Sequence, residues 1–325
     1  MTGRKKATPV PPPDGATAWG PGEPLAGSDR PHPPVGVGLW ALGRWDAEAE
    51  ERTRRSIDRA LEQNLPWFDT AEVYGNGRSE RLLGDALARR SSVGAARPFV
   101  STKVSWEHLT ASQVRAAMTG SLHRLGTASV DVYLVHAPDP HRPIAETMGA
   151  MEALADEGKA RAIGVSNFAV DEMEAAESAL ARHRLAVNQI RCNLLDLEEA
   201  RPVLEYARAR GIVVQAYSPL ARGLLAGRYL AGGKVPPEVR RFALRPLGKD
   251  AFPAALERAR AIERLAGKAG VPMASIALHG LRRLGAVPVV GTSRPEQVDA
   301  LVAAWRVRPP DDVLDRADEI AREPT

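Results

Sequence analysis

Four side chains suited to proton transfer stand at or near the ends of short apolar runs in this 325-residue chain: Asp69, Tyr74, Lys103 and His136. Asp69 is the penultimate residue of PWFDT, Lys103 closes PFVSTK, and His136 closes VDVYLVH. Tyr74 follows Asp69 by five residues in FDTAEVYGNGRSE. A lysine at the end of a buried strand needs a counter-charge, which Asp69 supplies. A cation beside a tyrosine hydroxyl lowers the tyrosine pKa and makes the hydroxyl a usable general acid. With His136 orienting a carbonyl oxygen, the four groups suit protonation of that oxygen as hydride reaches its carbon.

The elements that must position these groups are eight apolar runs that alternate with amphipathic helical stretches. Helical segments such as AEERTRRSIDRALEQN and SERLLGDALARR carry apolar residues at three- and four-residue spacing. Strand-helix alternation predicts a parallel sheet with right-handed crossovers, and eight units predict a single (β/α)₈ TIM barrel of the α/β class. The expected strands are residues 35–40, 66–70, 98–103, 130–136, 161–166, 186–190, 212–218 and 287–290.

Three segments depart from this repeat. Residues 1–34 are rich in proline and glycine and are expected to form an irregular or disordered N-terminal arm, so that the barrel domain spans 35–325. About seventy residues separate strands seven and eight, with a Gly/Pro-rich loop at 221–252 and helical stretches at 253–269 and 273–284. Such an insertion is typical of a functional loop. The final PPDDVLDRADEIARE predicts an extra C-terminal helix.

A doubly wound nucleotide-binding sheet is the competing architecture. Residues 36–41, GVGLWA, match the pattern G-x-G-x-x-A. That fingerprint requires a strand before its first glycine, but PHPP stands there, and no acidic residue ends a second strand about twenty residues later. The barrel is therefore the favoured fold.

Catalytic groups of such barrels lie at the carboxyl ends of the strands. Beyond the four residues above, polar residues end or follow the later strands as well: Ser166-Asn167, Gln189, Tyr217-Ser218 and Gly291-Thr292-Ser293-Arg294. Unpaired polar groups are costly in buried strands, so a succession of them on one rim indicates a binding and catalytic site.

Taken together, the motifs give the chain a specific resemblance to the aldo-keto reductase family. From about Gly36 to Ala321, the motifs FDTAEVYGNGRSE, STKVSW, YLVHAPDP, GVSNF, QAYSPLARGLLAGRY and VVGTSRPEQV occur in family order. The resemblance implies an NADP-dependent enzyme that reduces an aldehyde or ketone to an alcohol by hydride transfer. Tyr74 would be the proton donor, Lys103 and Asp69 would tune it, and His136 would orient the carbonyl.

The same resemblance implies a set of residues for the cofactor. Ser166, Asn167 and Gln189 would hold the nicotinamide carboxamide, and Tyr217 would stack on its ring. The pyrophosphate would lie along Ser218, Leu220 and Arg222. In the segment that Gly291 opens, Ser293 and Arg294 would meet the adenosine 2′-phosphate, with Gln297 near the adenine. A guanidinium suits that dianion, which favours NADPH.

The chain departs from the family pattern in three places. Ala300-Leu301 stand where an acid-Asn pair is common, which predicts weaker adenine contacts. The proline-rich arm replaces the usual N-terminal hairpin with its turn glycine. Leu39 stands where a threonine before Trp40 is common. Trp40 and Trp106 follow strands one and three, where they would line an apolar substrate pocket or belong to the core.

Composition indicates a bacterial protein of the cytoplasm. The formal charge of +4 is modest, with no sign of a nucleic-acid partner, and no apolar run has membrane-spanning length. The single cysteine, Cys192, excludes an internal disulfide and is expected to be buried and inert. His136, Asp139 and His141 resemble metal ligands in type, but the intervening prolines break any helical face, so no metal is expected. Oligomeric state, reaction direction and natural substrate stay open.

A second function belongs to a different class. The same barrel serves in proteins resembling potassium-channel β subunits, so the chain would then be a nicotinamide-binding regulatory or scaffold protein that senses redox state with little turnover. Multiple-turnover oxidation of NADPH by small carbonyl compounds distinguishes the enzyme from the sensor.

Overall fold

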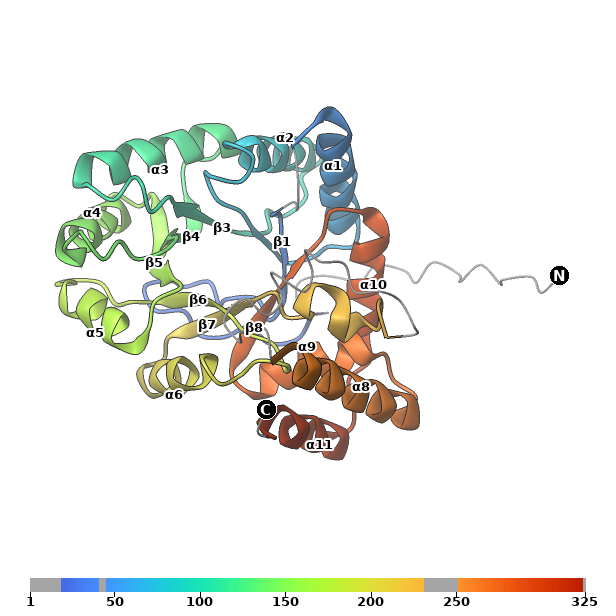
Figure 1. Ribbon diagram of the computed structural model, residues 1–325. Helices are drawn as coiled ribbons and strands as arrows, with labels where there is room; N and C mark the ends of the chain where they lie inside the picture. The colour runs from blue at the N-terminus through green and yellow to red at the C-terminus, as the bar shows by residue number, and fades with distance from the viewer. Residues whose placement is uncertain (1–18, 41–44, 231–250, 324–325) are drawn as a thin grey trace.

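Eight parallel strands close into one barrel in the computed structural model, which describes residues 19–40, 45–230 and 251–323 (Figure 1). The strands pair in sequence order and β1 also pairs with β8, so the sheet has no free edge. The predicted (β/α)₈ barrel is therefore confirmed. The strands are β1 (Gly36–Gly38), β2 (Trp67–Asp69), β3 (Phe99–Val104), β4 (Val130–Val135), β5 (Ala160–Ser166), β6 (Val187–Arg191), β7 (Val213–Tyr217) and β8 (Ala286–Gly291).

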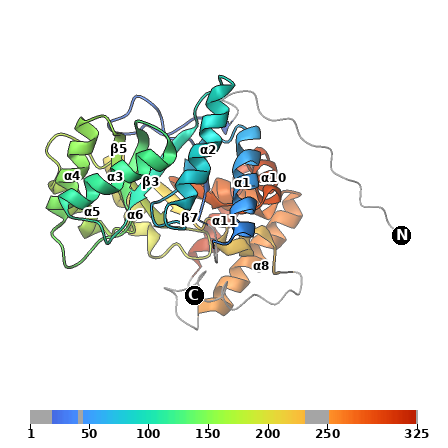
Figure 2. The ribbon, with the colours of Figure 1, turned by 90° about the horizontal axis from the view of Figure 1, so that it is seen from above.

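Helices surround the barrel, and Figure 2 shows them from above. Among the residues that the structure describes, one α-helix follows each of the first six strands, two α-helices lie between β7 and β8, and two follow β8. The helices are α1 (Ala47–Glu62), α2 (Arg78–Ser92), α3 (Ala111–Leu125), α4 (Ile144–Asp156), α5 (Val170–Ser178), α6 (Ala200–Arg210), α8 (Ala251–Ala269), α9 (Met273–Arg283), α10 (Pro295–Arg306) and α11 (Asp311–Arg322).

Local sequence signals explain where these helices begin and which face they bury. Asp46 caps α1 by accepting the Ala49 backbone N–H at 2.8 Å, and Thr110 forms a capping box with Gln113 at the start of α3. The buried residues of α1 recur at helical spacing and include Ile57, Ala60 and Leu61. The strand-helix loops at the carboxyl ends are thereby held on a rigid scaffold.

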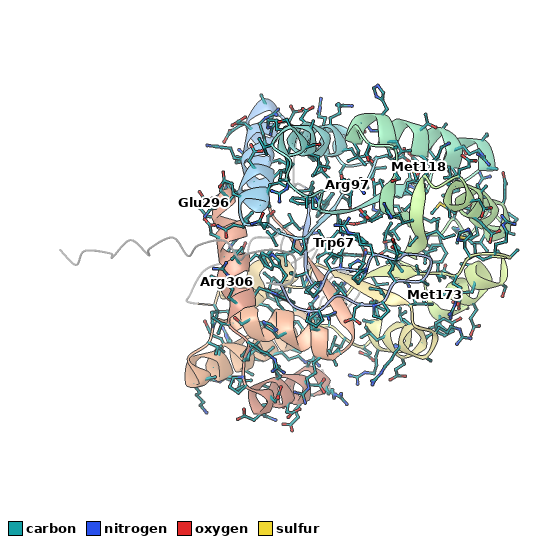
Figure 3. All side chains as sticks on the ribbon, turned by 180° about the vertical axis from the view of Figure 1, so that it is seen from behind. Trp67, Arg97, Met118, Met173, Glu296 and Arg306 are labelled. Atoms are coloured by element: carbon teal, nitrogen blue, oxygen red, sulfur yellow. The ribbon has the colours of Figure 1, made fainter. Side chains whose placement is uncertain are left out.

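The barrel interior is packed with large apolar side chains rather than open. Trp67, near the centre of Figure 3, is fully buried with Phe99, Val132 and Leu134 in one cluster. Fully burying one such large side chain contributes about 1.5–3 kcal/mol. Because apolar groups fill the interior, the few polar side chains within it stand out.

The described part of the N-terminal arm closes the amino-terminal end of the barrel. Leu25 packs into the interior cluster, and Glu23 and His32 form an antiparallel bridge with two backbone hydrogen bonds of 2.8 Å. Arg30 pairs with the buried Asp131 at 2.9 Å. The single bridge between Glu23 and His32 turns the chain back on itself, but residues 19–34 form no named strand, so the described part of the arm is irregular apart from the bridge. Proline has no backbone N–H to donate. The neighbouring prolines do not prevent this bridge, because Glu23 and His32 donate both of its hydrogen bonds. Residues 1–18 lie outside the described part of the chain.

The long connection between β7 and β8 agrees with the predicted insertion. A short 3₁₀ segment, η2 (Ala221–Ala226), follows β7, and α8 and α9 precede β8. Residues 231–250 of the predicted loop lie outside the described ranges. The extra C-terminal helix is α11, as predicted. Within the described ranges, we find no helix with both the length and the apolar character needed to cross a membrane.

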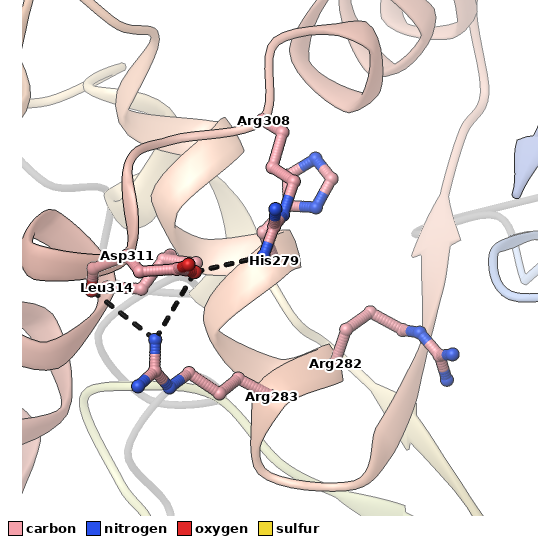
Figure 4. Close-up of a pocket in the computed structure, with 6 residues that line it drawn as sticks. All are labelled: His279, Arg282, Arg283, Arg308, Asp311 and Leu314. Atoms are coloured by element: carbon pink, nitrogen blue, oxygen red, sulfur yellow. Dashed lines mark hydrogen bonds and ion pairs between the residues drawn. The ribbon is translucent and has the colours of Figure 1, made fainter.

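A cavity of about 430 Å³ lies on the outer wall of the barrel, between the end of α9 and the start of α11 (Figure 4). Arg283 and Arg308 both pair with Asp311, at 3.6 and 2.9 Å. Arg282 and Arg283 end α9 just before β8 begins, so this cavity faces the amino-terminal end of the barrel. It is separate from the strand ends that carry the predicted site. The cavity is lined by His279, Arg282, Arg283, Arg308, Asp311 and Leu314.

Candidate active site

A buried ion pair joins the carboxyl ends of β2 and β3. Lys103 Nζ lies 2.7 Å from Asp69 Oδ2 and 2.8 Å from the Thr70 carbonyl oxygen. Ser101, opposite Asp69 in the sheet, donates its hydroxyl to Asp69 Oδ1 at 2.7 Å. Burial lowers the pKa of Lys103, but Asp69 and Tyr74 together raise it by more than burial lowers it, so the net shift is upward. Lys103 is therefore a charged ammonium at neutral pH.

Tyr74 stands beside this ammonium. Its hydroxyl oxygen lies 3.4 Å from Lys103 Nζ. Burial raises the pKa of Tyr74, Lys103 lowers it, and Asp69 raises it again, so the net shift is upward. The prediction of a lowered pKa is therefore wrong for the chain without ligand, because desolvation of the phenolate and the charge of Asp69 outweigh Lys103. The phenol is consequently protonated at neutral pH and can donate its proton.

The loop that carries Tyr74 is clamped by its neighbours. Gly75 has φ +59°, and a Cβ there would lie 2.4 Å from the indole of Trp45, so the ring packs directly on the backbone. Gly77, at φ +78°, meets Arg124 in the same way. Arg78 donates to the Trp45 carbonyl oxygen at 2.9 Å. These contacts explain the two glycines of the YGNGRSE motif and fix Tyr74 on the rim.

His136 completes the group of four. Its ring meets Tyr74 and Trp106 edge to face, with centroid separations of 5.6 and 5.5 Å. Burial, with a further contribution from Lys103, lowers the pKa of His136 to about 3, so the imidazole is neutral. Its Nδ1 atom is buried and has no hydrogen-bond partner among the described residues. A neutral imidazole carries one N–H and can donate it to a carbonyl oxygen.

The two rim tryptophans are exposed, unlike the core. Trp40 and Trp106 have 45% and 47% of their surface accessible. The Arg222 guanidinium lies 5.0 Å from the ring of Trp40, and Trp106 packs on His136. Trp106 therefore borders His136, Trp40 lies beside Arg222, and the exposure of both indoles argues against the core interpretation.

The nearby Asp139 and His141 form a turn: the Asp139 carboxylate accepts the backbone N–H of His141 at 3.0 Å. Nowhere in the described ranges do three His, Cys, Asp or Glu side chains gather as metal ligands would.

The predicted nicotinamide residues form one hydrogen-bonded set on the rim. Tyr217 donates its hydroxyl to Asn167 Oδ1 at 2.8 Å, and Asn167 Nδ2 donates to the His136 carbonyl oxygen at 3.0 Å. Ser166 donates to the Gln189 carbonyl oxygen at 2.8 Å. Asn167 is held at φ +62°, which is uncommon for a residue with a side chain. These contacts link the ends of β4, β5, β6 and β7.

Gln189 points differently from the prediction. Its Nε2 atom donates into the barrel, to Asp69 Oδ1 at 2.9 Å and to Gln215 Oε1 at 2.7 Å. Only the carboxamide oxygen of Gln189 is left for a nicotinamide. The side chain of Gln189 therefore contacts the Asp69 carboxylate directly, which its position in the sequence did not indicate.

The backbone after β7 is strained at three nearby residues. Ser218, Ala221 and Arg222 have φ values of +55°, +44° and +54°. Left-handed conformations of residues with side chains cost about 1–3 kcal/mol each and cluster at ligand sites. Short turns stabilise this segment, including a hydrogen bond from Gly223 N to the Leu220 carbonyl oxygen at 2.8 Å. The strain coincides with the segment predicted to line a pyrophosphate.

The segment after β8 leads into the amino terminus of α10. Gln297 Oε1 accepts the Ser293 backbone N–H at 2.8 Å, and the exposed Arg294 directly precedes the helix. Free N–H groups at a helix start and a guanidinium suit a phosphate. Leu301 is buried, so at this position an apolar contact replaces the amide expected from the family pattern.

Comparisons with known proteins agree with this geometry. The family model described as "Aldo/keto reductase family" matches residues 34–322. The chain belongs to the aldo/keto reductase family. The protein is thus an oxidoreductase of a family that acts on carbonyl groups. Aldo-keto reductase YhdN of Bacillus subtilis is 35% identical over a match that spans 60% of each chain. The uncharacterized oxidoreductase Rv2298 of Mycobacterium tuberculosis is 33% identical over 83% of each chain.

Solved structures of the family superpose over most of the barrel. Glycerol dehydrogenase AKR11B4 of Gluconobacter oxydans gives a TM-score of 0.79 at 29% identity, covering 92% of this chain and 94% of that one. An aldo/keto reductase of Klebsiella pneumoniae in complex with NADP and acetate gives 0.71 at 26% identity, covering 92% and 95%.

Three residues near the site were missed from sequence. Ser101 and Gln215 are polar residues within strands, His32 lies in the N-terminal arm, and all three are fully buried. Ser101 lies on β3 two positions before the rim residue Lys103, and Gln215 lies on β7 two positions before the rim residue Tyr217. Alternation along a strand places such residues on the same side, which is the signal that could have found Ser101 and Gln215.

Proposed function

We propose that this protein reduces an aldehyde or ketone to an alcohol with NADPH, with Tyr74 as proton donor. The observation that carries the proposal is the arrangement of a protonated phenol 3.4 Å from a buried, charged lysine whose counter-ion is Asp69. Few other roles require a charged lysine to be fully buried beside a tyrosine hydroxyl. Proton donation to a carbonyl oxygen is a role that uses both groups.

Each residue then has a definite task. Tyr74 transfers its phenolic proton to the substrate oxygen, and the phenolate that forms is stabilised by the Lys103 ammonium. Asp69 keeps Lys103 charged and in place through its 2.7 Å contact. His136, neutral because burial lowers its pKa, donates an N–H to the carbonyl oxygen and orients it toward Tyr74.

The residues of the rim fit a nicotinamide dinucleotide phosphate. Asn167 and the oxygen of Gln189 would hold the carboxamide, and Tyr217 would lie against the ring. Its hydrogen bond to Asn167 is consistent with this role. NADPH supplies the hydride when bound. The strained residues after β7 would line its pyrophosphate, and Ser293 and Arg294 at the start of α10 would bind the 2′-phosphate. The solved Klebsiella pneumoniae relative, described in complex with NADP, supports this choice of cofactor.

The substrate would be a small carbonyl compound with an apolar or aromatic group. Trp106 against His136 and Trp40 against Arg222 present exposed indoles and would line its pocket. Burial raises the pKa of Cys192 to about 12, so the single thiol is inert. One inert cysteine fits a reducing bacterial cytoplasm, where we place the reaction.

Multiple-turnover oxidation of NADPH tests the proposal. 4-Nitrobenzaldehyde and methylglyoxal serve as probes, and the alcohol formed is identified by chromatography. Stoichiometric alcohol over many turnovers supports the reductase. Tight NADPH binding with no turnover on any carbonyl probe would contradict it and favour a redox-sensing protein.

A further inference from the structure

A chain of hydrogen-bonded polar side chains crosses the apolar interior of the barrel. It runs from His32 in the N-terminal arm through Gln215 on β7 and Gln189 on β6 to Asp69 on β2. The separations are 2.7 Å between His32 Nε2 and Gln215 Nε2, 2.7 Å between Gln215 Oε1 and Gln189 Nε2, and 2.9 Å between Gln189 Nε2 and Asp69 Oδ1. Each of the four residues is at most 3% exposed. The N-terminal arm, which closes one end of the barrel, is thereby hydrogen-bonded through two glutamines to the Asp69 carboxylate at the other end.

The direction of every hydrogen bond in this chain follows from its two ends. His32 Nδ1 lies 2.8 Å from the Pro33 carbonyl oxygen, which can only accept, so Nδ1 carries the proton. Nε2 of the neutral ring is then an acceptor and receives an N–H from Gln215. The Gln215 oxygen consequently faces Gln189, whose amide donates both of its hydrogens, one to Gln215 and one to Asp69. Every donor therefore faces an acceptor.

The other neutral tautomer of His32, with the proton on Nε2, would be unfavourable at Asp69. A proton on His32 Nε2 would turn the Gln215 oxygen toward the ring and its nitrogen toward Gln189. Gln189 would then have to turn its own oxygen to that nitrogen, and this oxygen would face the Asp69 carboxylate at 2.9 Å. Two acceptors in contact within a dry interior cost far more than they gain. Burial lowers the pKa of His32 to about 3, which agrees with a neutral ring.

We propose that His32 is a positioning residue for the catalytic acid: its neutral Nδ1–H tautomer orients Gln215, and through Gln215 it holds Gln189 as a hydrogen-bond donor to Asp69. This inference rests on the proposed role of Tyr74 as the acid. Together with the Ser101 hydroxyl, the donor from Gln189 holds Asp69 Oδ1, and Oδ2 remains directed at Lys103. The ammonium is thereby held beside the Tyr74 hydroxyl. The N-terminal arm thus contributes to catalysis without touching substrate or cofactor.

Two substitutions at one position separate this role from packing. His32→Phe keeps a ring against Trp67 and Phe99, which lie 4.5 and 4.9 Å away by centroid, but removes the acceptor. His32→Gln is the matched control, because its amide oxygen can accept from Gln215. We expect kcat for 4-nitrobenzaldehyde to fall about 3- to 30-fold in His32→Phe, the range of coupling through such networks. KM should change little, and His32→Gln should restore most of kcat.

The partner variant Gln215→Met interrupts the same chain one step closer to Asp69. Since both substitutions break one chain, the double variant should lose no more kcat than the more impaired single variant. Multiplied losses, unchanged kcat in a folded His32→Phe protein, or failure of His32→Gln to restore kcat would each overturn the proposal.

A measurement independent of turnover keeps the inference separate from the proposed function. Long-range ¹H–¹⁵N spectra of the full-length protein at neutral pH report which nitrogen of His32 carries the proton. We expect protonated Nδ1 and bare Nε2, with or without NADPH. A proton on Nε2 or a charged ring would overturn the orientation of the chain. If the wild-type protein reduces none of the carbonyl probes, the proposed function fails and the catalytic part of the inference fails with it, while the spectrum still decides the orientation.

Discussion

Removing the Lys103 charge is the most informative perturbation of the acid. The ammonium lies 3.4 Å from the Tyr74 oxygen, where negative charge would develop in the proposed proton transfer. At an effective dielectric constant of about 20, a unit charge at that distance stabilises the phenolate by about 5 kcal/mol, or roughly 4,000-fold in rate. Asp69 contacts the same ammonium and offsets part of this effect. If it offsets half, about 70-fold remains. We therefore expect Lys103→Met to lower kcat between about 70- and 4,000-fold.

Stability must be separated from chemistry in this experiment. Lys103→Met leaves the Asp69 carboxylate buried without its partner, which costs about 3–5 kcal/mol. The double variant Lys103→Met/Asp69→Asn removes both charges and should recover much of that loss in thermal unfolding. The rate of hydride transfer is followed by NADPH absorbance in a single turnover, with binding measured by fluorescence. A folded, NADPH-binding Lys103→Met protein whose rate falls less than about tenfold would refute the electrostatic reasoning.

Three further predictions follow from the same contacts. Arg294→Ala should weaken NADPH binding about 10- to 150-fold and leave NADH binding almost unchanged, since only NADPH carries the 2′-phosphate; equal weakening, measured by titration, would refute the assignment. Gly75→Ala should lower stability by about 1–3 kcal/mol and reduce kcat, because a Cβ meets Trp45 at 2.4 Å and φ is +59°; unchanged unfolding and turnover would contradict the clamp. His32 and His136 have folded-state pKa values lowered from 6.5 to about 3, so the unfolded chain binds more protons below pH 6.5. Stability should be full above pH 6.5 and fall toward pH 3, by about 2.7 kcal/mol per histidine at pH 4.5. In denaturant titrations, His32→Gln should reduce that slope by about 1.4 kcal/mol per pH unit, and an unaltered slope would refute the burial argument.

The barrel and the four chemical groups could be predicted because each depends on a local signal. Alternation of apolar strands and amphipathic helices specifies the architecture, and a parallel barrel brings the ends of its strands to one rim. Asp69, Lys103 and His136 are strand-end polar residues, so their proximity followed from topology alone. Tyr74 followed from its place in a glycine-containing loop after Asp69.

What could not be predicted depends on burial and on contacts across the barrel. A nearby lysine suggested a lowered pKa for Tyr74, but the desolvation that raises it is a property of the folded site. The orientation of Gln189 depends on Gln215 and His32, which lie 26 and 157 positions away in sequence, and no local pattern encodes that arrangement. The bridge between Glu23 and His32 was hidden because the surrounding prolines suggested an irregular chain.

Tyr74→Phe provides the most direct test of the central claim, that the phenol beside Lys103 donates the proton. The substitution removes one oxygen and preserves the ring against His136. With 4-nitrobenzaldehyde and NADPH, we predict that turnover is abolished while the dissociation constant for NADPH stays within about twofold of the wild-type value, because no cofactor contact is assigned to the hydroxyl. Turnover at the wild-type rate in the folded, NADPH-bound variant would contradict it.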